Sequence, residues 1–317
     1  AARSASLAFN YSSPASPFAH LSALVIVAGH AVYNPPHDAS SPTTPFSSPA
    51  AWAFDEAVPE ASRPRPADLV AHVREGVRRA RENPEALLVL SGGATRAAAG
   101  PKSEAASYYA LAEALFGPGL GLDEEGPAGG AGGGSNASTR ERRRRQTAGD
   151  DDARHHSSAG GGGTPPPPPT PEHIGRVVLE EFARDSLENL LFSLCRFRQV
   201  VGSYPASISV VSFPVKARRF SDLHRAALAW PRDRFEFVGV GGEGAGGREA
   251  AERREMEFAA GEFAGDPYGC ESRKLREKRY RRNPWRGFHP YPRGCEEMAE
   301  LMATCAGKPY EGKLPWN

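Results

Sequence analysis

Two hydrophobic patterns alternate along the chain. Short apolar runs, typical of strands covered on both faces, are followed by stretches in which apolar residues recur every three to four positions, as in amphipathic helices. We expect strands at residues 23–29, 86–93, 176–181, 207–214 and 235–240. We expect helices at residues 67–82, 103–116, 186–201 and 220–230. This alternation predicts a single α/β domain with a mainly parallel five-stranded sheet and helices on both of its faces, a three-layer sandwich.

Three stretches interrupt the pattern. Residues 34–66, 117–172 and 241–250 are dominated by Gly, Pro, Ala, Ser and charged residues, which cannot bury enough apolar surface to offset chain entropy. We therefore expect long disordered insertions at about 34–66 and 117–172. The chain would then divide into a flexible segment at 1–20, the α/β domain at 21–240, a flexible linker at 241–265 and a basic, aromatic C-terminal tail at 266–317 that packs on the domain.

Charge and cysteine content narrow the class of protein. The net charge is +1, which gives the whole molecule no electrostatic attraction to nucleic acid or membrane. No apolar run reaches the roughly 18 residues of a spanning helix. The four cysteines are too few for a disulfide scaffold in a chain of 317 residues, so reduced thiols and a cytoplasmic location are expected. Cys195 lies on an apolar helix stripe, and the cysteines of the tail lack a C-x-x-C pair, so no metal site is expected.

Polar residues gather where the predicted strands end. In a parallel sheet these carboxyl ends meet at one edge, and ligands bind there. The candidates are Gly29 and His30 after the first strand, Ser91, Gly92, Gly93, Arg96 and Glu104 after the second, Glu181, Ser186 and Asn189 after the third, and Lys216, Arg219, His224 and Arg225 after the fourth. The loops that lead into the strands are mostly plain turns. This asymmetry predicts a ligand site at the carboxyl edge.

The residue types suggest roles. The amides of Gly92 and Gly93 and the side chains of Arg96, Lys216, Arg219 and Arg225 would neutralise an anionic group. Glu104 and Glu181 would bind hydroxyl groups or act as acid and base, and His30 or His224 would carry the proton.

Each feature also has a structural interpretation. Asp185 and Glu188 have the spacing of a capping box, in which Asp185 would cap the helix that follows. The Ser-Gly-Gly turn at 91–93 fits close packing as well as anion binding, His30 fits a buried core position, and the basic residues after the fourth strand fit a solvated face. Capping leaves Glu181, Ser186 and Asn189 unexplained, so these three are expected to contact the ligand.

Four motifs together resemble a known family. The segments VIVAGH, SGGATR, EEFARDSLENLLFSLCRF and FPVKARRFSDLHRAAL are similar to the YdcF/SanA-like domain of unknown function, in its chiefly fungal form. The resemblance implies a Rossmann-like fold and a ligand motif at residues 185–189, where Leu187 departs from the Asn-Thr of the bacterial pattern. It also implies that His224 and Arg225 match a His and an Arg of the family. S-adenosylmethionine is suggested as a cofactor by this resemblance alone, and the cofactor is otherwise unknown.

Two functions remain open at this point. The first is binding of a nucleotide-like or phosphorylated small molecule, with transferase or hydrolase activity, in which nucleic acid is not the expected partner. The alternative is a non-catalytic binding or scaffold protein whose tail, SRKLREKRYRRNPWRGFHPY, docks RNA or an acidic partner through interleaved basic and aromatic residues. The substrate and the oligomeric state are not predicted.

Overall fold

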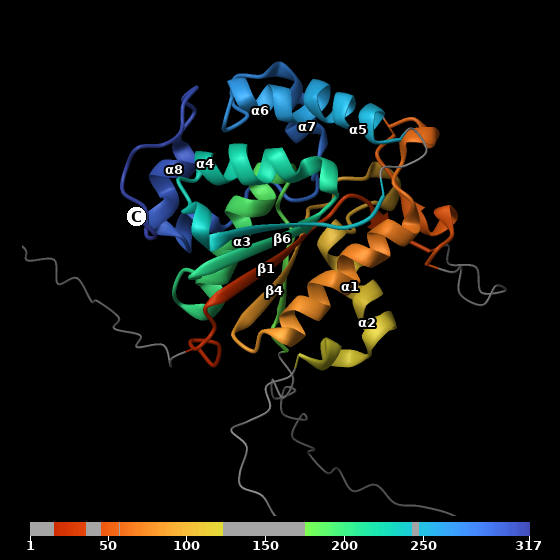
Figure 1. Cartoon of the computed structure of the whole chain (residues 1–317), viewed down its shortest axis with the longest axis horizontal. Coiled ribbons are helices and arrows are strands. Elements are labelled where there is room, and N and C mark those ends of the chain that lie inside the picture. Colours follow the sequence, from red (N-terminus) through yellow and green to blue (C-terminus); the bar gives the residue numbers. More distant parts are fainter. Residues whose placement is uncertain (1–15, 36–45, 57, 123–174, 243–246) are drawn as a thin grey trace, which may run out of the picture. The chain divides into compact units, whose positions relative to one another are not determined.

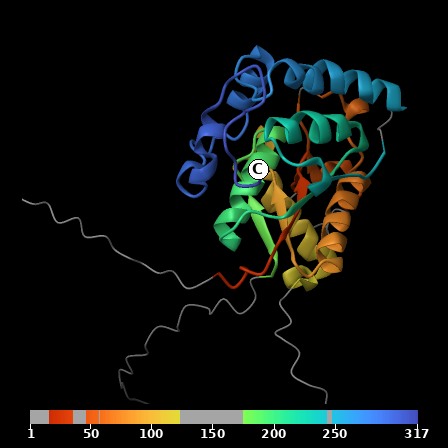
Figure 2. The same ribbon diagram turned by 60° about the vertical axis from the view of Figure 1, so that its left-hand side comes forward.

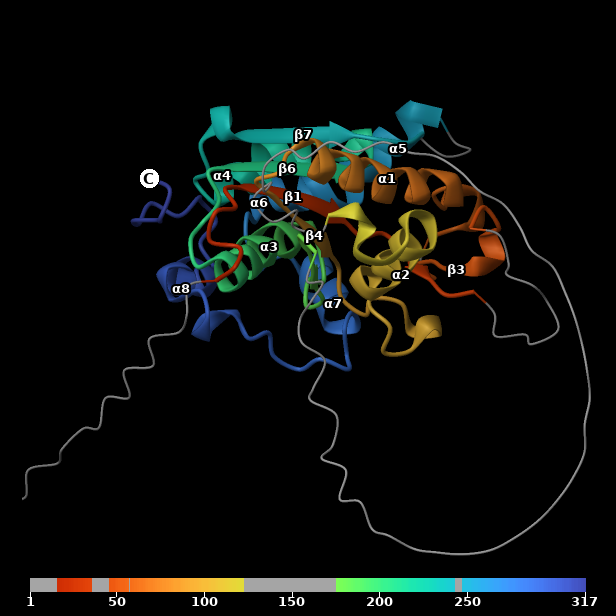
Figure 3. The same ribbon diagram turned by 90° about the horizontal axis from the view of Figure 1, so that it is seen from below.

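The computed structural model describes residues 16–35, 46–56, 58–122, 175–242 and 247–317. Five parallel strands form the main sheet in the order β5-β4-β1-β6-β7 (Figure 3). These strands are β1 (Ala23–Ala28), β4 (Ala86–Ser91), β5 (Val177–Glu180), β6 (Ser207–Ser212) and β7 (Phe235–Gly239). The chain adds strands outward from β1 to β5 and then returns to the other side of β1. The predicted α/β fold with a mainly parallel sheet is confirmed, and the strand order reverses between β1 and β6.

Alternate residues of each strand enter two separate cores. In β1, Val25 and Val27 pack with α1 (Pro66–Glu82) and α2 (Glu104–Phe116). Leu24 and Ile26 pack with α3 (Ser186–Val201) on the opposite face. Figure 1 shows α1 and α2 on one side of the strands and α3 and α4 on the other. Successive side chains of a strand point to opposite faces of the sheet. Because both faces are covered by apolar cores, the strands are continuous hydrophobic runs in the sequence.

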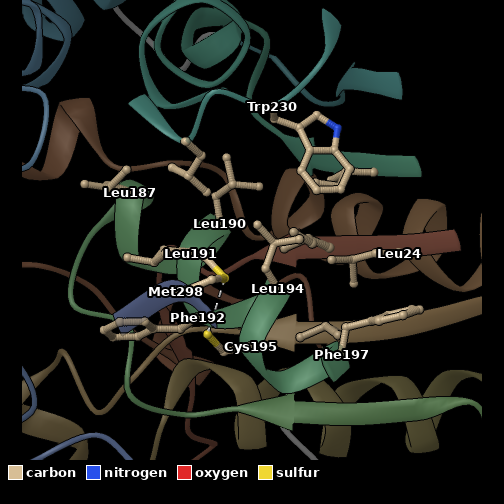
Figure 4. Packing of buried hydrophobic residues seen from close by; sticks show 14 of the residues in the cluster. Leu24, Leu187, Leu190, Leu191, Phe192, Leu194, Cys195, Phe197, Trp230 and Met298 are labelled. Carbon is tan, nitrogen blue, oxygen red and sulfur yellow. Dashed lines mark hydrogen bonds between the residues drawn. The ribbon is translucent and has the colours of Figure 1, made fainter. Parts of the chain in front are cut away.

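Helix α3 lies between the sheet and the tail. Its apolar residues point towards β1 on one side and towards Met298 of the tail on another (Figure 4). Asp185 caps its first turn by accepting a hydrogen bond from the Glu188 amide at 3.0 Å. Gly202 ends the helix in a left-handed conformation with φ of 92°, which glycine adopts without steric cost.

The predicted helix at 220–230 is shorter and less regular than expected. A π-helix at Arg219–His224 leads into a single α-helical turn, α4 (Arg225–Ala227). The wider π-turn buries both its first residue and its last, Arg219 and His224. π-Helical segments are rare and occur often at functional sites.

The predicted flexible linker at 241–265 is wrong for residues 247–265. These residues form α5 (Gly247–Glu255), a π-helix (Met256–Ala260) and α6 (Gly261–Gly265). Their attachment is specific, because Phe263 is buried in the core beside α3 and Glu255 forms an ion pair with Arg219 at 3.0 Å. A Gly-rich composition concealed these tertiary anchors, and residues 243–246 lie outside the described part.

The tail follows with α7 (Arg273–Arg281) and α8 (Ala299–Ala303). Figure 2 shows this blue segment on the side of the green α3 that faces away from the orange α1. Leu275, Tyr291, Met298 and Trp316 are buried against the α3 core, which supports the expected packing of the tail on the domain.

Part of the predicted insertion at 34–66 is ordered. Strand β2 (Val32–Tyr33) pairs antiparallel with β3 (Trp52–Ala53), and Trp52 packs edge-on against Tyr108 at 6.2 Å. Disorder is therefore the wrong prediction for residues 46–56 and for 58–66, which contain a 3₁₀ turn at Glu60–Ser62 and lead into α1. It is also wrong for 117–122, where Leu120 and Leu122 are buried. Residues 1–15, 36–45 and 123–174 lie outside the described residues.

The four cysteines form two disulfides. Cys195 of α3 is bonded to Cys295, and Cys270 is bonded to Cys305, with Cα–Cα distances of 5.4 and 5.5 Å. The expectation of reduced thiols is contradicted, because the tail brings each cysteine next to a partner that is distant in the sequence. Along the described chain, no helix is long and apolar enough to cross a membrane.

Candidate functional site

The reversal of strand order brings together the residues that follow β1 and β6. The His30 Nε2 atom lies 3.1 Å from Oγ of Ser212, and the Lys216 Nζ atom lies 2.6 Å from His30 Nδ1. A hydrogen bond thus joins the lysine amine to Nδ1, and Nε2 faces the Ser212 hydroxyl, which can donate or accept as the tautomer of the ring requires. Burial, followed by the charge of Lys216, holds the pKa of His30 well below its usual range. His30 is therefore a neutral, partly exposed imidazole at the switch point of the sheet.

Glu104 lies under this edge in an enclosed position. A Cβ atom on Gly29 would come 2.6 Å from Glu104 Oε2, and one on Gly92 would come 2.5 Å from the same oxygen. Glycine is needed at both positions for this close approach. The Glu104 carboxylate accepts a hydrogen bond from Thr95 and forms an ion pair with Arg96 at 3.1 Å. This pairing leaves Glu104 as a buried counter-ion rather than the free acid, base or hydroxyl ligand that was predicted.

The glycine amides do not face an anion. The Gly92 amide donates to the Glu180 carbonyl at 2.9 Å, and the Gly93 amide donates to the Ala183 carbonyl at 2.8 Å. Their predicted role in neutralising a ligand is wrong, because both hydrogen bonds are used inside the protein. Arg96 is also buried and donates to the His30 carbonyl at 2.5 Å, so it supports the edge from below.

Two further predicted residues belong to an internal network. The Asn189 amide group donates to Ser91 Oγ at 2.8 Å, and Ser91 donates to Glu180 Oε2 at 2.7 Å. Tyr291 of the tail donates to the other Glu180 oxygen at 3.0 Å. Burial raises the pKa of Glu180 to about 7, and these hydrogen bonds oppose that rise. Ser91 and Asn189 therefore hold a buried carboxyl group, and ligand contact is not needed to explain them.

Glu181 and Arg225 lie apart from the switch point. Glu181 is partly exposed, accepts from Ser103 Oγ at 2.7 Å and forms an ion pair with Arg286 at 2.8 Å. Arg225 donates to the carbonyls of Ser221 and Trp230 at 2.7 and 2.5 Å. Arg225 thus satisfies backbone carbonyls within and just after its own helix. This is a structural role in place of the predicted ligand contact.

A cluster of cations lies above the switch point. Lys216 and Arg219 come from the turn after β6, as predicted, and the tail adds Lys278 of α7 and Arg282, which directly follows that helix. Burial, followed by the charge of Arg219, holds the pKa of Lys216 well below its usual value. Burial, followed by Arg282 and Arg219, lowers the pKa of Lys278 to about 7. These residues affect one another's titration because they lie close together in a region of restricted solvent access.

The carboxylates near the cluster are already paired. Glu255 pairs with Arg219, and Asp55 forms an ion pair with Arg282 at 2.7 Å. Among the described residues, Lys278 forms no hydrogen bond and no ion pair within 4.0 Å, and the only polar partner of Lys216 is His30. In the described part of the chain, neither lysine therefore has a carboxylate in direct contact, and Glu104, Asp185 and Glu255 act on them only from a distance.

The contribution of α7 was missed in the sequence. The tail was expected to pack on the domain with its charges in solvent, and its basic segment was considered as a docking surface only in the alternative function. Leu275, Lys278 and Arg279 of α7, with Arg282 directly after it, recur at helical spacing and form an inward face. Arg279 forms an ion pair with Asp185 at 2.7 Å, which keeps the pKa of that carboxyl below its usual range despite burial. The periodicity around Leu275 was the available signal for an inward face.

Ser186 and His224 meet beside this cluster. The Ser186 Oγ atom lies 2.8 Å from His224 Nε2. Burial, followed by the charge of Arg219, holds the pKa of His224 well below its usual range, as it does for His30 with Lys216. The sequence supplied both residues as candidates but gave no reason to pair them.

One pocket in the described part of the chain lies away from the candidate residues. A cavity of about 590 Å³ lies at the opposite edge of the sheet, where Ser22 and Ala206 precede β1 and β6, and it contains none of the predicted residues. No group of three or more potential metal ligands occurs among the residues that the structure describes.

Comparison with known proteins gives one distant relative and no functional name. The chain is 27% identical over 163 residues to the uncharacterised protein YOR238W of Saccharomyces cerevisiae, which covers 45% of this chain. The alignment spans 52% of the yeast protein, about half its length. No protein-family profile matches the chain, and no solved structure matches it. Membership of the YdcF/SanA-like family accordingly stays a prediction.

S-adenosylmethionine, the cofactor suggested by that resemblance, does not fit the cation cluster. The molecule carries a positive sulfonium and a positive ammonium group beside one carboxylate. Arg219, and either lysine in its protonated form, would repel both cations, and the nearby carboxylates are already paired with arginines. We therefore assign it no role in this site.

Proposed function

We propose that the carboxyl edge of the sheet binds a small anionic molecule, nucleotide-like or phosphorylated, and that the protein is a transferase or hydrolase acting on it. The observation that carries the proposal is the pair of lysines, Lys216 and Lys278, which share the edge with Arg219 and have no carboxylate partner among the described residues. Like charges held together in a poorly solvated region raise the energy of the empty site. An anion placed between them would relieve this repulsion and form charge-assisted hydrogen bonds.

A chemical label tests this proposal although the ligand is not identified. Pyridoxal 5′-phosphate combines an anionic group with an aldehyde that forms an imine with neutral amines, and borohydride makes the adduct permanent. At pH 7.5 we expect preferential labelling of Lys278 and Lys216, because burial lowers both pKa values. Lys274, whose side chain is 59% exposed on the same helix as Lys278, serves as the internal reference.

Competition with an anion shows whether the labelled lysines belong to an anion site. Inorganic pyrophosphate should protect Lys278 and Lys216 and leave the labelling of Lys274 unchanged, as judged by peptide mass spectrometry. Equal labelling of all three lysines, or labelling of Lys278 that pyrophosphate does not reduce, would reject an anion site at this edge.

A second function is favoured by a different surface. Three aromatic side chains after the start of α7 remain exposed, with Tyr280 at 88%, Trp285 at 47% and Phe288 at 97%. The exposed Arg276 and Arg281 lie in the same segment. Aromatic rings between cations are the combination that stacks and neutralises single-stranded nucleic acid. We therefore propose RNA docking by the tail as the second candidate.

Mobility shifts of a labelled uridine oligonucleotide test this candidate. The variant W285A/F288A should lose tenfold or more in affinity, because each stacked base contributes about 1–3 kcal/mol. Lys278→Ala is the matched control, since it disrupts the anion site and leaves the exposed rings in place. Equal RNA affinity of the wild type and the double variant would exclude the tail as an RNA surface.

A further inference from the structure

A serine and a histidine form a hydrogen-bonded pair at the start of α3. Ser186 is the first residue of this 16-residue helix, and its Oγ atom lies 2.8 Å from Nε2 of His224. Ser186 is 8% exposed and His224 is fully buried. The π-helix that ends at His224 turns the imidazole inward, and Phe263 fixes it edge-on at 4.5 Å.

The imidazole is held in the form that accepts a proton. Burial and the charge of Arg219 lower the pKa of His224 and keep it neutral near pH 7. The tautomer that accepts from the Ser186 hydroxyl at Nε2 carries its hydrogen at Nδ1, which has no hydrogen-bond partner among the described residues. A hydroxyl on a neutral, positioned imidazole is the arrangement that activates a serine nucleophile.

The surroundings of the pair suit a negatively charged electrophile. The positive charges of Arg219, Arg279 and Lys278 reach His224, and the Asp185 carboxylate, which also reaches it, is ion-paired with Arg279. The amides of Ser186 and Leu187 lie in the first turn of α3, where backbone N–H groups have no acceptor within the helix. A tetrahedral oxyanion or a phosphoryl group at Ser186 would therefore meet the positive charge of these side chains and of the helix N-terminus.

We propose that Ser186 is a catalytic nucleophile for phosphoryl transfer from phosphomonoesters, with His224 as its general base. This rests on the proposed anion site and adds the reaction type. The Ser186 Oγ–P bond forms as the bond from phosphorus to the leaving oxygen breaks. The Ser186 proton moves to His224 Nε2 and from there to the leaving oxygen. Water then attacks the phosphoserine, releases inorganic phosphate and restores the Ser186 hydroxyl.

Two electrophiles test the nucleophile. With p-nitrophenyl phosphate, turnover is measured and the phosphoserine intermediate is trapped by acid quenching. Diisopropyl fluorophosphate, from which fluoride leaves, shows whether the Ser186 hydroxyl is activated. We expect modification at Ser186 by peptide mass spectrometry. Ser186→Ala should abolish this modification, and His224→Gln should slow it by about 10²–10⁴-fold. Ser186→Thr should retain part of the reactivity at this position.

Ser193→Ala is the matched control for the serine variants. Ser193 lies on the same helix, is fully buried and has an Oγ atom without a partner among the described residues. This variant makes the same chemical change two turns away and should leave the modification of Ser186 intact. Thermal melts of all variants separate unfolding from loss of reactivity.

Binding of pyrophosphate, measured by calorimetry, separates this inference from the proposed function. Ser186→Ala should bind pyrophosphate within a few-fold of the wild type. If the wild type binds pyrophosphate but neither electrophile modifies Ser186, the nucleophile is rejected and the anion site stands. If the wild type binds no anion, the proposed function fails and the assignment of Ser186 fails with it.

Discussion

Replacing Lys278 by Met should make the protein more stable near neutral pH and weaken its affinity for anions. The pKa of Lys278 is lowered from 10.5 to about 7, chiefly by burial and then by Arg282 and Arg219. The unfolded chain therefore binds a proton between pH 7 and 10.5 that the folded protein does not bind. The free energy of unfolding must consequently rise with pH across this window, and the full cost of charging Lys278 is felt below pH 7.

The size of this effect follows from the same pKa. The difference from 10.5 corresponds to at most about 4–5 kcal/mol, since each factor of ten in proton affinity is about 1.4 kcal/mol. Because Lys278 is partly exposed, we expect about 2–3 kcal/mol of added stability for Lys278→Met at pH 6.5, and convergence with the wild type near pH 10. Pyrophosphate should flatten the pH dependence of the wild type, because the bound anion favours the protonated lysine.

Guanidinium unfolding at pH values from 6.5 to 10 measures these free energies. Arg276→Met is the matched control, since Arg276 is exposed on the same helix and its replacement should not change the pH dependence. Calorimetric titration of pyrophosphate at pH 8 in two buffers of different ionisation enthalpy should show proton uptake by the wild type and not by Lys278→Met. Parallel pH curves for the wild type and Lys278→Met, or a variant that is less stable at pH 6.5, would refute the buried-lysine reasoning.

Three further predictions concern the scaffold. Asp185→Ala should cost about 3–5 kcal/mol in guanidinium unfolding, because it removes a helix cap and leaves a buried cation unpaired; a loss below about 1 kcal/mol would mean that the cap alone matters. Reducing the Cys195–Cys295 disulfide, which links residues 100 positions apart, should lower the free energy of unfolding by up to about 4–5 kcal/mol. Alkylation of both thiols in unreduced, denatured protein would contradict this disulfide. Replacing residues 123–174 by a short Gly/Ser linker should leave the melting temperature within a few degrees, because the Arg176 amide donates to the Leu122 carbonyl at 3.1 Å and loop closure depends weakly on length; a collapse in soluble yield would show that the segment is structural.

The linear sequence was sufficient for the features that depend on local pattern. The five parallel strands follow from apolar runs, and the cap at Asp185 follows from its spacing to Glu188, because a strand or a helix turn is specified by residues a few positions apart. The gathering of polar residues at the carboxyl edge, where the candidate site lies, also follows, since residues such as His30 and Lys216 come directly after strands. Composition was a poorer guide, because a few anchoring residues such as Phe263 order a Gly-rich segment that would otherwise remain flexible.

Only the tertiary structure decided which of the candidate residues lie together. Gly92 could be assigned to a turn from the sequence, but whether its amide faced a ligand or the Glu180 carbonyl depended on a strand nearly ninety positions away. The hydrogen bond between Ser186 and His224 joins elements that are far apart in the sequence. The same holds for Lys278, which lies beside Lys216 and Arg219. No local sequence pattern predicts either contact. Charges and hydrogen bonds act through space, so the packing of the tail determines which charged groups lie at the carboxyl edge. The strands that form this edge are specified by their own residues.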